Sequence, residues 1–340
     1  MKKEFWLGNY ARPEEAGVLR CAWDPDRGLE VLSRFTGFLN PSFLILHPRR
    51  PVLYTVEETA EGAVCAWDLQ TGAPVLLSRF PSGGADPCHL ALSPDARWLY
   101  AANYTGGSAA CFALDEAGRI TARTDLVQHE GHGPRADRQE KAHVHFAYPC
   151  GSRVLFCDLG QDLIFVYRNE EGRLREEARL SAPAGQGPRH LAVSPVFPDL
   201  LYCVTELAGT VLTFRGSLEG GYTLIGERST LPEGDFPGNT AAAIHLSPDG
   251  RTLMVSHRGL DSIAVLPLDA EGLPGEPVLS PCVRIPRDFL PIGGEDVLVA
   301  SQQDGVLQAY RLRNARLTPL PWRLESPSPV CLQPVLSAPV

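Results

Sequence analysis

The feature that most constrains the fold is a phrase that recurs six times along the chain. Each copy is an apolar run, a turn that contains proline or glycine, and a second apolar run that ends in polar residues. Short β-prone runs on both sides of such a turn are typical of a β-hairpin. The copies are FLILHPRRPVLYTVEE (43–58), HLALSPDARWLYAANY (89–104), HFAYPCGSRVLFCDLG (145–160), HLAVSPVFPDLLYCVTEL (190–207), AIHLSPDGRTLMVSHRG (243–259) and FLPIGGEDVLVASQQ (289–303).

The prolines expected in the hairpin turns set the period. They fall at positions 48, 94, 149, 195, 248 and 291, so five steps cover 243 residues and the mean step is 48.6 residues. A period of about 50 residues with four strands per repeat is typical of propeller blades. The chain of 340 residues holds seven such periods. We therefore predict an all-β fold, a seven-bladed β-propeller with four antiparallel strands per blade, in a single domain over residues 1–340. A two-sheet sandwich, the alternative, predicts no fixed period.

The two ends of the chain are expected to complete one blade together. The N-terminal runs FWLGNY, GVLRCAW and LEVLSRF resemble a second, third and fourth strand that lack a first strand. The C-terminal run PVCLQPV (329–335) resembles a first strand that lacks the other three. Joining them closes the ring and removes exposed sheet edges.

Polar residues are expected to converge on one face of the ring. In an antiparallel hairpin, the start of the first strand and the end of the second strand lie at the same end. Asp158 and Asp288 are good candidates for bonds between blades, and His245 for an interior histidine; the remaining set favours a binding or catalytic site. Its members are His89, His143, His145, Arg189, His190 and Arg287 at the starts of first strands, and Glu57, Glu58, Asn103, Tyr104, Glu206, His257 and Arg258 at the ends of second strands.

Composition excludes several classes of partner. The formal net charge of −9 disfavours a nucleic-acid interface, and no apolar run approaches the ~18–20 residues of a membrane span. Nine scattered cysteines without a C-x-x-C pair, and an N-terminus unlike a secretion signal, favour a cytoplasmic protein with reduced thiols. His143 and His145 could chelate, but no third ligand of standard spacing accompanies them, so we expect no metal and no other cofactor.

Five motifs resemble the lactonase family of seven-bladed propellers, across nearly the whole chain and in the family's order. They are RQEKAHVHFA (138–147), CDLGQDLIFVY (157–167), GQGPRHLAVSP (185–195), SPDGRTLMVSHRGLDSIAV (247–265) and PRDF (286–289). The resemblance implies a His, Arg, Glu and Arg as catalytic residues, which correspond to His145, Arg189, Glu206 and Arg258. His143 is the alternative to His145. The expected substrate contacts are Lys141, His143, His190, His257, Arg287, His89 and Asn103.

The resemblance implies hydrolysis of a small anionic lactone, most readily 6-phosphogluconolactone to 6-phosphogluconate in carbohydrate metabolism. Glu206 or His145 would act as general base, and the arginines would stabilise the oxyanion or hold the phosphate. Two alternatives remain open at this point. One is cycloisomerisation of a carboxymuconate to its lactone, in the opposite direction. The other is a non-catalytic interaction platform. The sequence does not indicate an oligomeric state.

Overall fold

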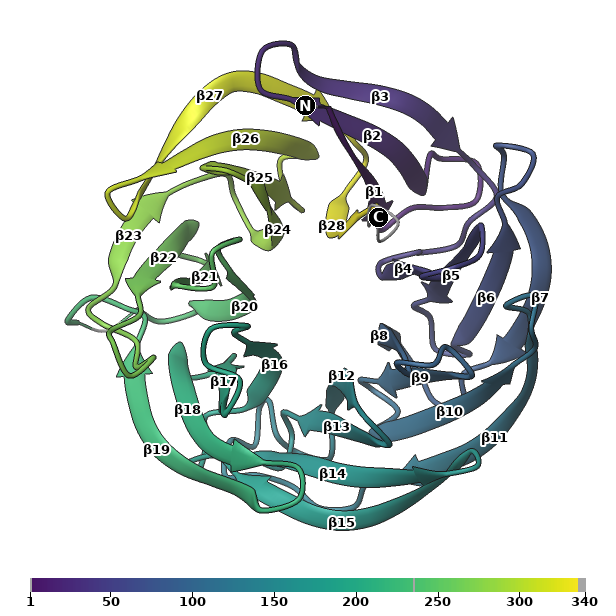
Figure 1. Cartoon of the computed structure of the whole chain (residues 1–340), viewed down its shortest axis with the longest axis horizontal. Coiled ribbons are helices and arrows are strands. Elements are labelled where there is room, and N and C mark those ends of the chain that lie inside the picture. The colour runs from purple at the N-terminus through teal and green to yellow at the C-terminus, as the bar shows by residue number, and fades with distance from the viewer. Residues whose placement is uncertain (1, 235, 336–340) are drawn as a thin grey trace. The chain divides into compact units, whose positions relative to one another are not determined.

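Seven antiparallel sheets of four strands confirm the predicted β-propeller architecture (Figure 1). The computed structural model describes residues 2–234 and 236–335, and within these residues it contains 28 strands and no helix. Each sheet is one blade, in which consecutive strands pair. The predicted third blade, for example, corresponds to β8 (Pro87–Leu92), β9 (Trp98–Asn103), β10 (Ser108–Leu114) and β11 (Ile120–Gln128).

Two compact units make up the chain, and each is described by itself. Unit 1 comprises residues 1–7, 20–33 and 186–334, and unit 2 comprises residues 8–19, 34–185 and 335–340. Our prediction of one domain over residues 1–340 stays a prediction. In addition to the third blade, unit 2 holds the second blade, β4 (Leu44–Leu46), β5 (Val52–Glu57), β6 (Ala63–Asp68) and β7 (Val75–Pro81), and the fourth blade, β12 (Val144–Cys150), β13 (Arg153–Asp158), β14 (Leu163–Glu170) and β15 (Arg173–Ser181).

Unit 1 holds three complete blades. They are the fifth blade, β16 (Pro188–Val193), β17 (Leu200–Thr205), β18 (Thr210–Ser217) and β19 (Gly221–Ser229); the sixth blade, β20 (Thr240–Leu246), β21 (Thr252–Arg258), β22 (Ser262–Pro267) and β23 (Val278–Pro281); and the seventh blade, β24 (Pro286–Gly293), β25 (Asp296–Ser301), β26 (Val306–Arg313) and β27 (Arg316–Glu325).

The C-terminal strand completes the N-terminal blade, as predicted. β28 (Pro329–Pro334) pairs with β1 (Lys3–Asn9), which pairs in turn with β2 (Val18–Asp24) and β3 (Gly28–Phe35). β28 also packs against β24 of the seventh blade. There the carboxylate of Asp288 accepts a hydrogen bond from the backbone N–H of Leu332 at 2.8 Å and contacts His245 at 2.9 Å. The predicted role of Asp288 in bonding between blades is therefore confirmed.

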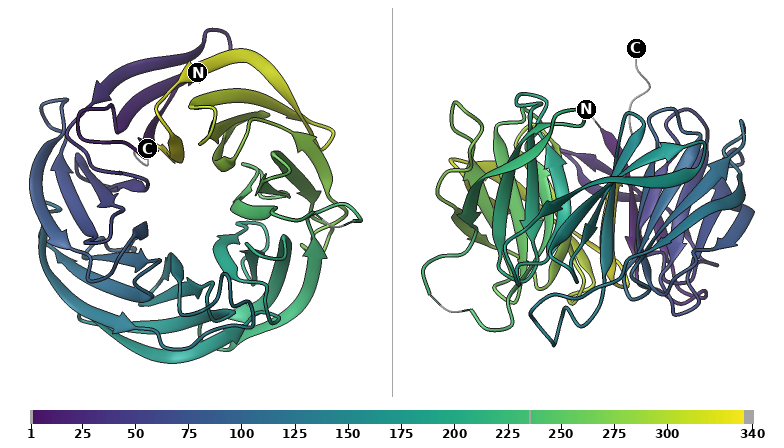
Figure 2. Two further views of the ribbon diagram at one scale, coloured as in Figure 1. Left: turned by 180° about the vertical axis from the view of Figure 1, so that it is seen from behind. Right: turned by 90° about the horizontal axis from the view of Figure 1, so that it is seen from below.

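Within each unit, the first strands of neighbouring blades lie next to one another. β4, β8 and β12 follow one another along the concave side of unit 2, as do β16, β20 and β24 in unit 1 (Figures 1 and 2). Apolar clusters fill the space between neighbouring blades; one of them joins Tyr54 and Val56 of the second blade to Leu99 and Phe112 of the third. These clusters fix the blades of one unit and so position the polar residues at their ends.

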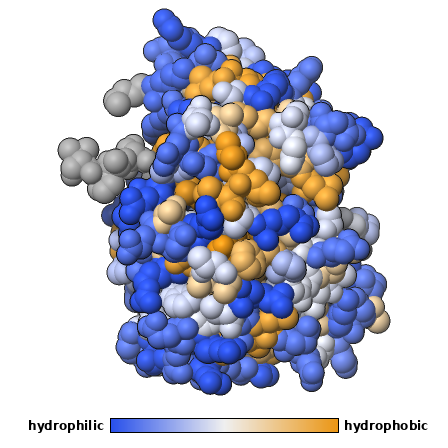
Figure 3. Space-filling model, turned by 90° about the vertical axis from the view of Figure 1, so that its right-hand side faces the viewer, coloured by the Kyte–Doolittle hydropathy of each residue, from blue (hydrophilic) through white to orange (hydrophobic). Residues whose placement is uncertain are grey.

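The outer strands carry mostly polar side chains, but β19 of unit 1 and β7 of unit 2 also expose apolar ones. β7 exposes Val75 and Leu76, with 55% and 48% of their surface accessible. Figure 3 views the molecule from the side on which β7 lies and shows apolar side chains among the polar ones.

Two of the turn prolines are not in turns. Pro149 lies inside β12 and Pro291 inside β24, one or more residues before the hairpin turn. Both are on the first strand of a blade, which is an edge strand, so a proline without an N–H need not break a ladder bond. The period of the repeat is unaffected, because each proline still marks the same blade element.

None of the nine cysteines, all of which lie in the described residues, forms a disulfide bond, and seven of them are buried. No helix among the described residues is long and apolar enough to cross a membrane. The cytoplasmic location stays a prediction.

Candidate active site

A β-bulge at the start of the first strand recurs in several blades. It leaves one residue of that strand unpaired and changes the direction of its side chain. The register between β16 and β17 skips from Pro188 to His190, so Arg189 is the extra residue. The same shift makes His145 the extra residue of β12 and Arg287 that of β24. Bulges are frequent next to active sites because they re-aim a side chain. Three of the residues predicted from the sequence thus occupy one structural position in their blades.

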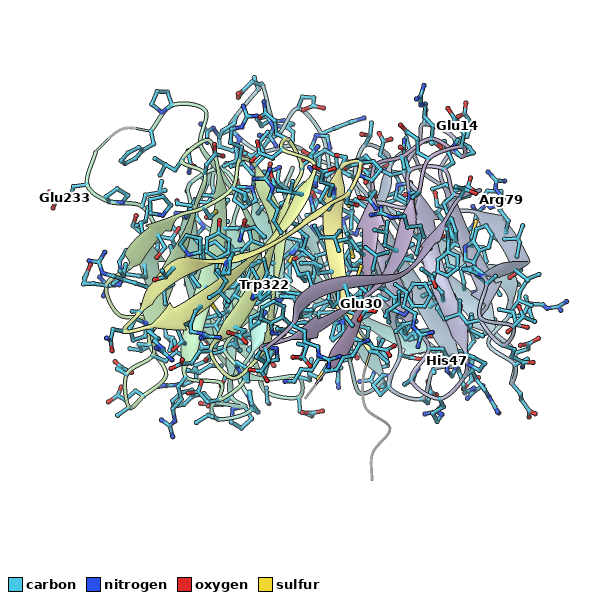
Figure 4. The ribbon with its side chains drawn as sticks, turned by 90° about the horizontal axis from the view of Figure 1, so that it is seen from above. Glu14, Glu30, His47, Arg79, Glu233 and Trp322 are labelled. Carbon is cyan, nitrogen blue, oxygen red and sulfur yellow. The ribbon has the colours of Figure 1, made fainter. Side chains whose placement is uncertain are left out.

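The start of the first strand and the turn after the second strand lie at the same edge of each blade, which we call the polar edge. The first residue of this turn donates its backbone N–H to the carbonyl of a residue that precedes the first strand of the same blade. Figure 4 shows the two edges of unit 2, with Glu14 in such a turn at one edge and His47 in a hairpin turn at the other. The bonds run from Glu58 to Asn40, from Tyr104 to Asp86, from Leu159 to His143, from Glu206 to Gly187 and from Gln302 to Ile285.

In unit 1 the polar edge carries an Arg–Glu–Arg cluster. Glu206 Oε2 accepts a hydrogen bond from Arg189 Nε at 2.8 Å and another from Arg258 Nη2 at 2.9 Å. The side chains of Arg189 and Glu206 are only 2% and 4% exposed, whereas Arg258 is 17% exposed. The structure thus places these three residues in contact, as we expected from the sequence.

Backbone carbonyls of β20 accept further hydrogen bonds from this cluster. Arg189 Nη1 donates to the carbonyl of Ala242 at 2.7 Å, and Arg258 Nη2 donates to that of Ala241 at 2.9 Å. Arg189 Nη1 also contacts His190 Nε2 at 3.0 Å, which requires that nitrogen to accept. His190 thus orients Arg189.

The cluster carries an excess of one positive charge. Two guanidinium groups and one carboxylate are largely withdrawn from water, a costly arrangement unless each charge is paired and hydrogen-bonded. Glu206 compensates one arginine, and the more exposed Arg258 is available to solutes. A buried cationic group of this kind is suited to bind an anionic substrate group or to stabilise a developing oxyanion.

In unit 2 the polar edge carries His143 and His145 around Tyr104. The ring of His143 stacks on that of Tyr104 at 4.5 Å, and the ring of His145 meets it edge-on at 5.5 Å. His143 Nδ1 faces the carbonyl of Tyr104 at 3.1 Å, and His143 Nε2 faces the carboxylate of Glu140 at 3.2 Å. Both nitrogens of His143 are therefore committed to acceptors of the protein itself.

Asp158 and Gly160 hold the backbone of the His143 segment. Asp158 Oδ1 accepts the backbone N–H of His143 at 2.8 Å, and its other oxygen contacts His129 Nδ1 at 2.8 Å. A side chain at Gly160 would place its Cβ 1.9 Å from the carbonyl oxygen of Lys141, so only glycine fits. Asp158 thereby joins β13 of the fourth blade to His129, the residue that follows β11 of the third blade, in agreement with its predicted role in bonding between blades.

Sequence reasoning missed two contacts of this segment. Glu140 bonds to His143, and Arg138 Nη2 donates to the hydroxyl of Tyr104 at 3.4 Å. Burial is the largest single influence on the pKa of Glu140 and would raise it. The hydrogen bond from His143, a backbone hydrogen bond and the charges of His143 and Lys141 together lower that pKa. Both residues lie in the motif RQEKAH, and their spacing before His143 was the available signal.

The other predicted contacts have different surroundings. Lys141 is exposed and Arg287 is partly exposed. His89 is buried between the rings of Phe43 and Phe146, with centroid distances of 4.1 and 4.0 Å. Our prediction that His145 shares one pocket with the arginines stays a prediction.

Asn103 and His257 form part of a buried layer at the ends of second strands. Both have no exposed surface. Asn103 Nδ2 donates to Ser108 Oγ at 3.0 Å. His257 contacts Thr230 Oγ1 through Nε2 at 2.9 Å and Asn239 Nδ2 through Nδ1 at 3.2 Å. We predicted both as substrate contacts; the structure buries their side chains, and that role stays a prediction.

His257 should make the stability of the protein depend on pH. Burial, followed by the nearby charge of Arg258, lowers the pKa of His257 from 6.5 to about 4. Between these values the unfolded chain binds a proton at His257 and the folded chain does not, so acid favours unfolding. We expect the free energy of unfolding to fall by roughly 3 kcal/mol more in wild type than in His257→Gln between these pH values.

Denaturant unfolding at a series of pH values measures this difference. His132→Gln is the matched control, because His132 is exposed. Parallel pH profiles for wild type and His257→Gln would contradict the expectation.

Comparison with known proteins agrees with the geometry of the blades. Residues 4–334 match the model of the family "Lactonase, 7-bladed beta-propeller". The chain belongs to this lactonase family. The resemblance seen in its motifs is thereby confirmed, and the chain is a lactonase.

Individual relatives cover almost the whole chain. The 6-phosphogluconolactonase of Bacillus subtilis is 31% identical over 343 residues, covering 96% of this chain and 97% of the relative. The crystal structure of a candidate 6-phosphogluconolactonase from Bacteroides fragilis superposes with a TM-score of 0.90 at 28% identity, covering 98% of both chains. The periplasmic gluconolactonase of Pseudomonas aeruginosa gives a TM-score of 0.89 at 26% identity, covering 100% of both chains.

Proposed function

We propose that this lactonase hydrolyses 6-phosphogluconolactone to 6-phosphogluconate. The observation that carries the proposal is the Arg189–Glu206–Arg258 cluster, whose excess positive charge suits an anionic substrate. The names of the relatives from Bacillus subtilis and Bacteroides fragilis support the phosphorylated lactone. The name of the Pseudomonas aeruginosa protein supports the same chemistry on a lactone without phosphate.

The reaction needs a base, an oxyanion site and a proton for the leaving oxygen. A water oxygen attacks the lactone carbonyl carbon and loses its proton to the base. The carbonyl oxygen becomes an oxyanion, which cations or N–H donors stabilise. The ring C–O bond then breaks, and the proton returns to the leaving alkoxide, so that one carboxylic acid and one hydroxyl form.

We assign the base to His145 rather than to Glu206. Glu206 Oε2 accepts hydrogen bonds from both arginines, which stabilise its charged form and make it a poor proton acceptor. His143 is less suited, because both of its ring nitrogens face the acceptors Tyr104 and Glu140. His145 lies at a bulge, as Arg189 does. Glu206 then orients Arg189 and Arg258, which bind the oxyanion or the phosphate.

Initial rates with two lactones, and an assay for conversion of a carboxymuconate, test the proposal. Proton release in weak buffer, corrected for spontaneous hydrolysis, gives kcat/KM for 6-phosphogluconolactone and for gluconolactone. We expect the phosphorylated lactone to be preferred by about tenfold or more, as one charged hydrogen bond provides. We propose that no metal is needed, so prior treatment with a chelator should leave the rate unchanged.

Three outcomes would overturn parts of this proposal. No acceleration of either lactone would reject hydrolysis, whereas conversion of a carboxymuconate would indicate the cycloisomerase. Equal rates for both lactones would reject phosphate recognition. Loss of activity with the chelator, restored by a metal ion, would reject metal independence.

A further inference from the structure

Glu58 occupies, in the second blade, the position that Glu206 occupies in the fifth. The backbone N–H of Glu58 donates to the carbonyl of Asn40 at 3.2 Å, which is the bond that Glu206 makes to Gly187 at 2.8 Å. Asn40 Nδ2 also donates to the carbonyl of Glu58 at 3.2 Å. The backbone thus holds the Glu58 carboxylate at the polar edge of unit 2.

The surroundings of the two carboxylates differ in charge. Glu206 is paired with two arginines, whereas Glu58 accepts hydrogen bonds from two hydroxyl groups. Tyr10 Oη donates to Glu58 Oε1 at 2.8 Å, and Ser42 Oγ donates to Glu58 Oε2. In the part of the chain that the structure describes, no salt bridge involves Glu58.

The Glu58 carboxylate is half-buried and retains acceptor capacity. Each carboxylate oxygen has two lone-pair sites, and Tyr10 and Ser42 use one on each oxygen. An uncompensated carboxylate repels anionic groups and attracts O–H donors. Hydrogen bonds in which the acceptor is ionised are stronger than neutral ones.

We propose that Glu58 is a specificity-determining residue that accepts hydrogen bonds from the sugar hydroxyls of the lactone. Tyr10 and Ser42 orient its carboxylate for this role. The inference rests on the proposed lactone hydrolysis and names a residue of unit 2 that would recognise the hydroxyl groups of the substrate. It also indicates that ligands rich in carboxylates, such as a carboxymuconate, are disfavoured at this edge.

Two six-membered lactones separate recognition of hydroxyls from catalysis. Gluconolactone carries sugar hydroxyls, and δ-valerolactone has the same ester ring without them. We expect Glu58→Gln to lower kcat/KM for gluconolactone about 10- to 100-fold, mainly through KM, and to leave δ-valerolactone within about twofold of wild type. Tyr10→Phe should have a smaller effect in the same direction.

Glu176→Gln is the matched control, with the same change in charge on the outermost strand of the fourth blade. Glu176 lies on β15 and pairs with Arg179, whose Nε is 2.6 Å from Glu176 Oε1. We expect this variant to hydrolyse both lactones like wild type.

The outcomes separate this inference from the proposed function. Hydrolysis of both lactones by wild type, with an equal loss on both in Glu58→Gln, would assign Glu58 a general structural role and overturn the inference. An unchanged KM for gluconolactone in Glu58→Gln would overturn it as well. Wild type inactive on every lactone would reject the proposed function itself.

Discussion

Replacing Arg189 by alanine should lower kcat/KM for the lactone by ~10²–10³-fold, as the loss of one oxyanion or anion contact typically does. Arg189 donates to three acceptors: Glu206 Oε2, the carbonyl of Ala242 and His190 Nε2. Arg258→Ala should produce a loss of similar size. Without either arginine, the cluster loses its excess positive charge, and the anionic substrate or the oxyanion loses its counter-charge.

Conservative variants and a surface control make this result specific. Lysine at position 189 should restore only part of the activity, because one ammonium cannot reproduce the planar, multidentate geometry of the guanidinium. Arg313→Ala is the control, since Arg313 is 65% exposed and pairs with the exposed Glu295. Thermal unfolding of each variant separates a loss of activity from a loss of folded protein. Wild-type kinetics in both alanine variants would place the chemistry elsewhere.

A double variant tests whether His145 acts with this cluster. Residues that work as a unit show strongly non-additive losses. We expect His145→Ala combined with Arg189→Ala to be little worse than the more damaging single variant. Losses that multiply would indicate that the two residues contribute independently, contrary to the mechanism proposed for them.

The fold could be predicted from the sequence because the period of the repeat extends along the whole chain. Six hairpin phrases and two incomplete ends account for seven blades without any knowledge of packing. Small displacements do not alter this count. Pro149 and Pro291 are inside strands rather than turns, and yet each still identifies its blade.

The details of the site depend on displacements of one residue, which a sequence pattern does not resolve. Alternation along a strand assigns neighbouring residues to opposite faces, and a bulge resets this phase. The pattern SHRG therefore suggested contacts from both His257 and Arg258. In the structure, His257 is fully buried and Arg258 bonds to Glu206. Arg258, the last residue of β21, carries the more accessible side chain, whereas that of His257, one residue earlier, is buried.

Contacts made by long connecting segments could not be predicted from the repeat pattern either. The segment between β11 and β12 folds back so that Glu140 reaches His143. Buried Gln139 anchors it by donating to the carbonyl of Leu159 at 2.9 Å and to Asp162 at 2.8 Å. Neither bond follows from periodicity, because the segment has no strand of its own.

Removing the C-terminal strand should destabilise the protein by several kcal/mol. A chain that ends at Ser328 lacks β28, the first strand of the N-terminal blade. It loses the buried side chains of Val330, Cys331 and Leu332, which are at most 5% exposed. Burial of one aliphatic side chain contributes about 1.5–3 kcal/mol, and the backbone groups of β1 would lose their ladder partners.

The bond between Leu332 and Asp288 adds to this effect. Without β28, the oxygen of Asp288 that accepts the N–H of Leu332 has lost that donor, although Asp288 is only 8% exposed. A buried carboxylate without its donor carries a desolvation penalty. A chain ending at Val335 retains all of β28 and is the matched control. We expect thermal or denaturant unfolding to show a clearly lower midpoint for the chain ending at Ser328 and a wild-type midpoint for the control. Equal midpoints for the two truncated chains would mean that the N-terminal blade does not depend on its C-terminal strand.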